Sequence, residues 1–189
     1  MDPRVFLDIL HVAERLKNAT RHSYTSARRH ESVAEHSWRI ALMAYLLRDA
    51  FPQADMDKVT RMCLIHDLGE AFTGDIPTFD KTKADEEKED ALLAQWVDSL
   101  PEPVCADMRA LYTEMSERQT LEAQIYKALD SLEAVIQHNE GPIDTWLPLE
   151  YDLNLTYGDD KAAFSDYLTE LRKEIRRDTL DKIEHEKAL

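Results

Sequence analysis

A cluster of histidine and acidic residues in one short stretch, residues 60–80, has the spacing of a metal site. His66 and Asp67 are adjacent, and Glu70 follows His66 by four residues. Apolar residues recur here at helical spacing and predict a helix over about residues 55–72, with His66 and Glu70 on one face. An imidazole buried beside carboxylates is costly unless a cation completes the group, and a divalent metal ion would do so. For an isolated His–Asp pair, an ordinary polar helix end is the commoner explanation.

Two more polar residues fall among the apolar positions of other predicted helices. The capping-box sequence SVAE predicts a helix start just before His36, which then lies on or beside the apolar stripe. Asp130 lies inside the apolar pattern of a helix predicted over residues 118–139. Taken singly, a satisfied core histidine and a structural salt bridge explain them. Together with His66 and Asp67 they form two imidazoles and two carboxylates, a donor set that suits Mn, Co, Fe or Zn with positions open for water and substrate.

The composition predicts a globular protein that does not bind nucleic-acid polymers. A length of 189 residues suits one domain with a sizeable core, and the hydrophobic and charged fractions, 43% and 32%, are ordinary for a soluble protein. The net charge of −15 argues against binding DNA or RNA, because such binding depends on Lys and Arg at the phosphates. A small phosphorylated substrate remains compatible with this charge, since a metal ion and a few arginines can invert the field in one cleft.

Cysteine usage and apolar patterning predict a protein of the reducing cytoplasm. Cys63 and Cys105 have no C-x-x-C partner, so neither a disulfide framework nor a thiolate zinc site is expected. Residues 1–18 carry acids inside an amphipathic pattern, unlike a secretory signal peptide. No apolar run in the sequence approaches membrane-spanning length, so we expect no membrane partner.

One polar segment, residues 19–31, interrupts the helical pattern and is predicted to be a loop. It holds Arg21, Arg28 and Arg29 in a chain that is otherwise strongly acidic. A loop of this kind could lie over a site and supply cations for a phosphate. A solvated connector explains the same composition equally well.

The remaining patterns predict helices that pack in one domain, residues 1–189. Beyond the core, residues 141–189 are expected to form a turn-rich crossing segment and then a helix from about residue 159. We find no internal repeat and no linker that would divide the chain. Other helices are predicted near residues 2–18, 33–47 and 104–116, and one more begins within the charge-dense residues 81–90 and continues through Val97.

The order of these residues resembles the HD-domain metal-dependent phosphohydrolase superfamily, over roughly residues 5–140. Three runs, ESVAEHS (31–37), HDLGEAFTGDIPT (66–78) and KALDSLEA (127–134), resemble the 5′-deoxynucleotidase branch and its small HD-domain-containing relatives. The resemblance implies an all-α, single-domain, multi-helix bundle with a buried metal site. It also implies one divalent metal ion (Mn, Co, Fe or Zn, with Mg possible), a small phosphorylated substrate and a homodimer.

By the same resemblance, individual residues take expected roles. Glu70 and Asp75 would be the catalytic carboxylates that are not ligands, with the acid and base roles left open between them. Arg21 falls where that branch has an arginine that contacts substrate near the phosphate and sugar. Branch members commonly have a tryptophan shortly after that arginine, whereas this chain offers His22 or Tyr24. The expected metal ligands are His36, His66, Asp67 and Asp130.

The predicted function is therefore hydrolysis of nucleoside 5′-monophosphates, with deoxynucleotides preferred. A two-iron oxygenase would need further histidines between His66 and Asp130, and the sequence has none. A cyclic-dinucleotide phosphodiesterase of the HD-GYP type would need a GYP motif, which is absent. A triphosphohydrolase would use the same ligands, and only the short chain argues against it. A non-catalytic regulatory HD protein usually loses ligands, whereas all of the expected ones are present here.

Overall fold

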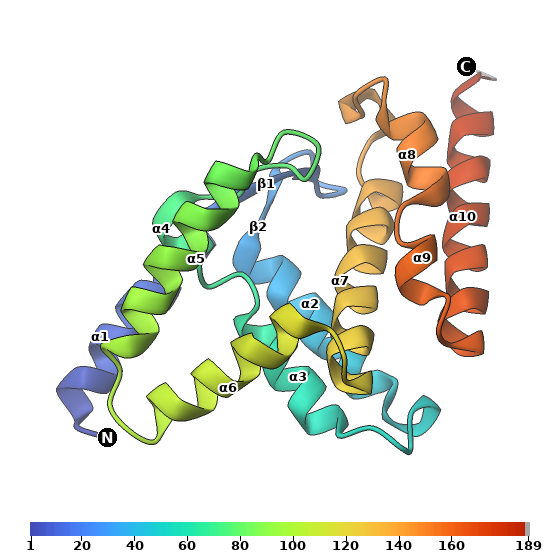
Figure 1. Ribbon diagram of the computed structural model, residues 1–189. Helices are drawn as coiled ribbons and strands as arrows, with labels where there is room; N and C mark the ends of the chain where they lie inside the picture. The colour runs from blue at the N-terminus through green and yellow to red at the C-terminus, as the bar shows by residue number, and fades with distance from the viewer. Residues whose placement is uncertain (188–189) are drawn as a thin grey trace.

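Helices make up nearly all of the regular structure in the computed structural model, which describes residues 1–187 (Figure 1). The all-α prediction is confirmed, with one small two-stranded sheet added. The strands are β1 (Thr20–Tyr24) and β2 (His30–Ser32). The α-helices are α1 (Pro3–Glu14), α2 (Val33–Leu46), α3 (Met56–Ile65), α4 (Glu70–Thr73), α5 (Lys83–Asp98), α6 (Val104–Glu117), α7 (Leu121–Glu140), α8 (Glu150–Thr156), α9 (Asp159–Ala162) and α10 (Asp166–Lys187), and short 3-10 turns cover Arg15–Lys17, Arg48–Ala50 and Ile143–Thr145.

The start of α2 is fixed by the capping box that the sequence predicts. Ser32 Oγ accepts a hydrogen bond from the Glu35 N–H, and the Glu35 carboxylate accepts one from the Ser32 N–H at 2.9 Å. Two backbone donors that an isolated helix would leave unpaired are thereby satisfied. His36 consequently lies in the first turn of α2, fully buried.

The main core lies between α2, α3 and α7, the helices that carry the expected metal ligands or lead into them. Ile40 of α2, Met62 of α3, and Ile125, Leu129 and Leu132 of α7 are fully buried in it. Each such side chain stabilises the fold by about 1.5–3 kcal/mol relative to an exposed one. This shared core therefore fixes the positions of the three helices relative to one another.

The segment predicted as a loop, residues 19–31, contains an antiparallel hairpin instead. Thr20 pairs with Ser32 and Tyr24 with His30, with an irregular register between them. Buried polar contacts hold it, because the Glu31 carboxylate accepts from Ser23 Oγ at 3.1 Å and lies 3.2 Å from Arg21 Nε. The strands therefore lack the alternating apolar pattern by which a sequence reveals a hairpin.

The predicted helix over residues 55–72 is also corrected, since it breaks at residues 66–69. There the backbone makes tight bonds between residues three apart, such as Leu68 N–H to Ile65 C=O at 3.1 Å. Side chains satisfy the carbonyls that leave the helix: Tyr112 Oη donates to Ile65 C=O and His66 Nδ1 to Cys63 C=O. Neighbouring residues of a regular helix point about 100° apart. The break lets His66 and Asp67 turn toward one point.

The C-terminal helices α8, α9 and α10 stack on one side of α7, opposite α5 and α6 (Figure 1). Two arginines of α10 hold the end of α8: Arg172 donates to the carbonyls of Asn154 and Tyr157, each at 2.9 Å, and Arg176 donates to that of Leu155 at 2.7 Å. Cationic donors at a helix C-terminus are stabilising. Among the described helices, none is both long and apolar enough to cross a bilayer.

Candidate metal centre

The structure brings together the four residues expected to bind metal. His36 Nε2 lies 3.1 Å from Asp130 Oδ1 and 3.8 Å from Asp67 Oδ2. His66 Nε2 lies 3.0 Å from Asp67 Oδ2 and 3.7 Å from Asp130 Oδ1. The donors come from α2, from the turn after α3 and from α7. His36, His66 and Asp67 thus offer three ligand atoms within 4.8 Å of one another, and Asp130 Oδ1 lies beside the two ring nitrogens.

The outer nitrogen of each imidazole is occupied, which fixes where its lone pair points. His36 Nδ1 donates to Glu133 Oε2 at 2.5 Å, and His66 Nδ1 donates to the Cys63 carbonyl at 2.9 Å. Both acceptors lack a proton to give, so Nδ1 carries the hydrogen in each ring. Each Nε2 then faces the carboxylates of Asp67 or Asp130 and is the ring atom that a metal ion would bind in place of a proton, as in carboxylate–histidine–metal arrangements.

The electrostatics of this group of donors favour a cation. His66 Nε2 is buried and forms no hydrogen bond within residues 1–187, although Asp67 lies near it, because their relative direction is unsuitable. Burial favours the neutral ring, yet Asp67 and Asp130 raise the pKa of His66 to about 10. In the protein alone a proton neutralises the carboxylates, and a divalent ion would replace it. These residues therefore fit a single divalent metal ion.

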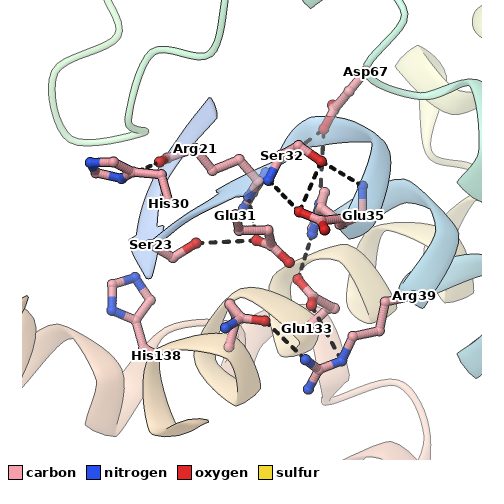
Figure 2. Close-up of polar contacts among 12 residues, drawn as sticks. Arg21, Ser23, His30, Glu31, Ser32, Glu35, Arg39, Asp67, Glu133 and His138 are labelled. Carbon is pink, nitrogen blue, oxygen red and sulfur yellow. Dashed lines mark hydrogen bonds and ion pairs between the residues drawn. The ribbon is translucent and has the colours of Figure 1, made fainter. Parts of the chain in front are cut away.

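Two supporting residues were missed by sequence reasoning, Glu133 and Lys127. Glu133 is fully buried and lies one turn beyond Asp130, with Arg39 Nε 3.5 Å from its second oxygen (Figure 2). Lys127 Nζ lies 2.7 Å from Asp130 Oδ2, the oxygen that faces away from the imidazoles. The pattern KALDSLE places all three on one helical face, which is the signal that could have identified them.

The two expected catalytic carboxyls line the cavity beside these donors. Glu70, the first residue of α4, is buried, and its Oε2 makes no hydrogen bond within the described chain. Burial, followed by Asp67 and Asp75, raises the pKa of Glu70 to about 9. Burial also raises the pKa of Asp75, against the effect of Arg21. Asp75 follows Gly74, whose φ of 76° lets the chain turn sharply after α4.

The arginine expected to contact substrate, Arg21, lies in the same cavity. Its Nη1 is 3.8 Å from Asp67 Oδ2 and its Nε is 3.2 Å from Glu31 Oε2 (Figure 2). Burial opposes its charge, but Asp67 and Asp75 raise its pKa. Glu31, another residue that sequence reasoning missed, is buried and forms the ion pair that holds this arginine in place. The guanidinium is thus charged and lies in a defined orientation beside the expected metal ligands.

The other two arginines of the hairpin lie elsewhere. Arg28 is exposed at the tip, where its φ is 62°, and pairs with Asp144 at 2.6 Å. Arg29 is also exposed and pairs with Glu35 at 2.6 Å. Neither lines the cavity, so the structure does not bring them to the phosphate site predicted for them.

The cavity has a volume of about 540 Å³ and extends well beyond the expected metal ligands. The hairpin, the segment after α4, α5, α6, α7 and α8 all contribute to its wall. The part of the cavity beside α8 is lined by His22, Phe79, His138, Glu150 and Asn154. A space of this size accommodates a small organic phosphate.

A model of the HD domain matches residues 13–172 of the chain. The chain belongs to the HD-domain family. Among HD-domain relatives, human 5′-deoxynucleotidase HDDC2 is 30% identical over 141 residues, covering 72% of this chain and 68% of that protein. The structure resembles the crystal structure of a predicted metal-dependent phosphohydrolase from Magnetospirillum magnetotacticum MS-1, with 28% identity and a TM-score of 0.79, covering 95% of this chain and 93% of that one.

A more distant HD-domain structure shares the fold alone. It is the cyanophage S-2L HD phosphohydrolase DatZ bound to dA and one catalytic Zn²⁺ ion, with 22% identity and a TM-score of 0.54, covering 93% of this chain and 94% of that chain. The family match and the relatives together make this chain an HD-domain phosphohydrolase. Nucleotides are the class of substrate that the named relatives support.

Proposed function

We propose that the protein is a metal-dependent phosphomonoesterase that hydrolyses deoxynucleoside 5′-monophosphates to nucleoside and phosphate. The observation that carries this proposal is the convergence of two imidazoles and two carboxylates at one end of a cavity that also holds Arg21 and Glu70. The names of the 5′-deoxynucleotidase relatives support it. So does the binding of dA and zinc by the cyanophage protein of the same fold.

His36, His66, Asp67 and Asp130 would hold the ion, each through an atom that already lies close to others of the set. A divalent ion supplies charge at a phosphate oxygen and lowers the pKa of a bound water. Zn, Mn, Co and Fe suit this mixed nitrogen and oxygen set. Lys127 and Glu133 keep Asp130 and His36 oriented for this task.

The other cavity residues bind and orient the phosphate and move protons. The Arg21 guanidinium binds phosphate oxygens through planar donors, and Glu31 limits its rotation. Glu70 and Asp75 provide the proton acceptor for the attacking water and the proton donor for the 5′ oxygen of the sugar. The pH–rate profiles of Glu70→Gln and Asp75→Asn will divide these two roles, because each variant removes one limb of the profile.

The charges around the cavity favour a monophosphate over a triphosphate. Glu86, Glu89 and Asp90 of α5 line it, and the nearby Lys81 is already paired with Glu89 at 2.8 Å. A polyphosphate tail directed toward α5 would meet these carboxylates. The negative charge of a single phosphate group, in contrast, would be balanced by the metal ion and Arg21 alone.

The test is phosphate release from a panel of deoxyribo- and ribonucleoside 5′-monophosphates and triphosphates, with Mn, Co, Zn, Mg or no metal added. Turnover that needs metal, prefers deoxynucleoside monophosphates and disappears in Glu70→Ala supports the proposal. The proposal is wrong if well-folded, metal-loaded protein releases no phosphate from any monophosphate. A homodimer and a cytoplasmic location stay predictions, to be checked by light scattering and by microscopy of the tagged protein.

A further inference from the structure

The end of the cavity beside α8 contains a buried carboxylate between two imidazoles. Glu150, the first residue of α8, is 1% exposed, and its Oε1 lies 3.1 Å from His22 Nε2 and 3.5 Å from His138 Nε2. Its Oε2 accepts a hydrogen bond from the Leu147 N–H at 2.6 Å. One carboxylate oxygen is therefore held by the backbone just before α8, and the other contacts His22 of the hairpin.

This arrangement determines which hydrogen-bonding atom His22 offers to the cavity. Glu150 Oε1 lies 3.1 Å from His22 Nε2, and because a carboxylate is an acceptor this contact favours the tautomer with the hydrogen on Nε2. The other ring nitrogen, Nδ1, is then an acceptor when the ring is neutral. The ring stands edge-on to Phe79, with ring centres 5.7 Å apart and planes at 87°, which limits its rotation.

Two further features complete a built site. Asn154, one turn along α8, is 3% exposed and lines the cavity, and its Nδ2 has no hydrogen-bond partner among the described residues. Behind the site, Trp146 Nε1 donates to the His138 carbonyl at 3.0 Å, and its ring packs against that imidazole. A buried amide donor without a partner is costly, and a ligand acceptor would satisfy it.

We propose that this α8 end is the nucleoside subsite, in which His22 Nδ1 accepts a hydrogen bond from a sugar hydroxyl and Asn154 Nδ2 donates to a base or sugar acceptor. Phe79 provides the apolar wall for the flat base. Glu150 acts as a positioning residue, because it sets the orientation and tautomer of His22. The inference rests on the proposed function for the phosphate end, and it assigns substrate selectivity to a helix outside residues 5–140.

The experiment measures calorimetric binding of deoxyadenosine, the nucleoside product, and KM and kcat for deoxyadenosine 5′-monophosphate. His22→Phe keeps a ring beside Phe79 and removes the acceptor. Deoxyadenosine binding should therefore weaken about three- to tenfold and KM should rise by the same factor, which is the effect of one hydrogen bond. The kcat value should stay within about twofold, because the lost contact exists in both ground and transition states. His11→Phe, at an exposed position of α1, is the matched control and should change nothing.

Glu150→Gln tests the positioning role, since a Gln amide can donate to Nε2 and so allow the tautomer in which Nδ1 is a donor. We expect it to weaken deoxyadenosine binding as much as His22→Phe does, with the double variant no weaker than either one. Because Glu150 is buried, its variant is used only if its melting profile matches the parent. His22 lines the cavity, so His22→Phe alone tests the subsite if Glu150→Gln does not fold.

The outcomes separate this inference from the proposed function. Deoxyadenosine binding that is lost in His22→Phe supports the subsite even if no nucleotide is hydrolysed, a result that would overturn only the function. Hydrolysis of deoxynucleotides with unchanged KM and unchanged nucleoside binding in His22→Phe overturns the subsite and leaves the function standing. Failure of the parent protein to bind deoxyadenosine also overturns the subsite.

Discussion

The two ends of the cavity are built in different ways. At the metal end, donors project from or beside the core helices α2, α3 and α7, and buried side chains such as Glu133 lock them from behind. At the α8 end, one residue of a polar hairpin meets one from a C-terminal helix, and Arg172 holds that helix in place. The proposed chemistry thus depends on helices of the main core, whereas the proposed recognition depends on two segments that are far apart in the sequence.

The largest expected effect comes from removing a donor at the metal end. Asp67→Ala should lower metal-dependent phosphate release by at least about 1,000-fold, because it deletes an oxygen that faces both Nε2 atoms. Phosphate release and metal content per chain measure it. Asp98→Ala, an exposed acid paired with Arg109, is the matched control. A metal-loaded, active Asp67→Ala protein would contradict the proposed ligand set.

A weaker effect is expected from the layer behind the donors. Glu133→Gln should reduce metal affinity about 10- to 100-fold, because a neutral amide holds the His36 N–H less strongly and lowers the basicity of Nε2. Competition with a chromophoric chelator measures the affinity. Glu140→Gln provides a close control, since Glu140 is also on α7 and also pairs with Arg39, but at the surface. Equal affinities in the two variants would show that burial of Glu133 serves packing alone.

The metal end should also give the protein without metal an unusual dependence on pH. Glu70 has a folded-state pKa of about 9 against an ordinary 4.5. Between these values the folded state keeps a proton that the unfolded chain releases, so this contribution to stability is complete below pH 4.5 and is lost as the pH rises through about 9. The free energy of unfolding, measured in denaturant with a chelator present, should therefore fall over this range. Glu70→Gln should show a flatter decline, and an identical slope would exclude Glu70 as the cause.

The smallest effect is expected at the tip of the hairpin. Arg28→Ala should leave KM and kcat within about twofold of the parent, because the side chain is exposed and paired away from the cavity. Arg21→Ala should instead raise KM strongly, because Arg21 lines the cavity beside Asp67. Nucleotide kinetics of the two variants test this contrast within one hairpin. Similar losses in both would mean that the hairpin moves onto the substrate as a unit.

Sequence reasoning succeeds where a pattern is local. The capping box of α2 and the helical face of α7 place His36 and Asp130 correctly among apolar neighbours, and the structure brings them beside His66 and Asp67. Their roles as ligands stay predictions until metal binding is measured. The family and the all-α fold follow from the same motifs and are confirmed.

Sequence reasoning fails where contacts between distant segments decide the structure. The break at residues 66–69 depends on the hydrogen bond that Tyr112 of α6 donates to the Ile65 carbonyl, and no local sequence pattern predicts that bond. The hairpin depends on the buried pair of Arg21 and Glu31, so composition alone suggests a polar loop. Arg28 looks identical to Arg21 in sequence, and only the course of the strands separates a cavity arginine from a surface one.

The packing of Trp146 has a practical consequence for studying the protein in solution. Its indole is 7% exposed and its ring centre lies 6.0 Å from that of His138, at the end of the cavity beside α8. Of the other two tryptophans in the sequence, Trp38 is 61% exposed and Trp96 packs near Phe72. The chain therefore carries a buried fluorophore behind the α8 end, and we expect its emission to lie to the blue of that of Trp38, so that titrations can be followed by intrinsic fluorescence.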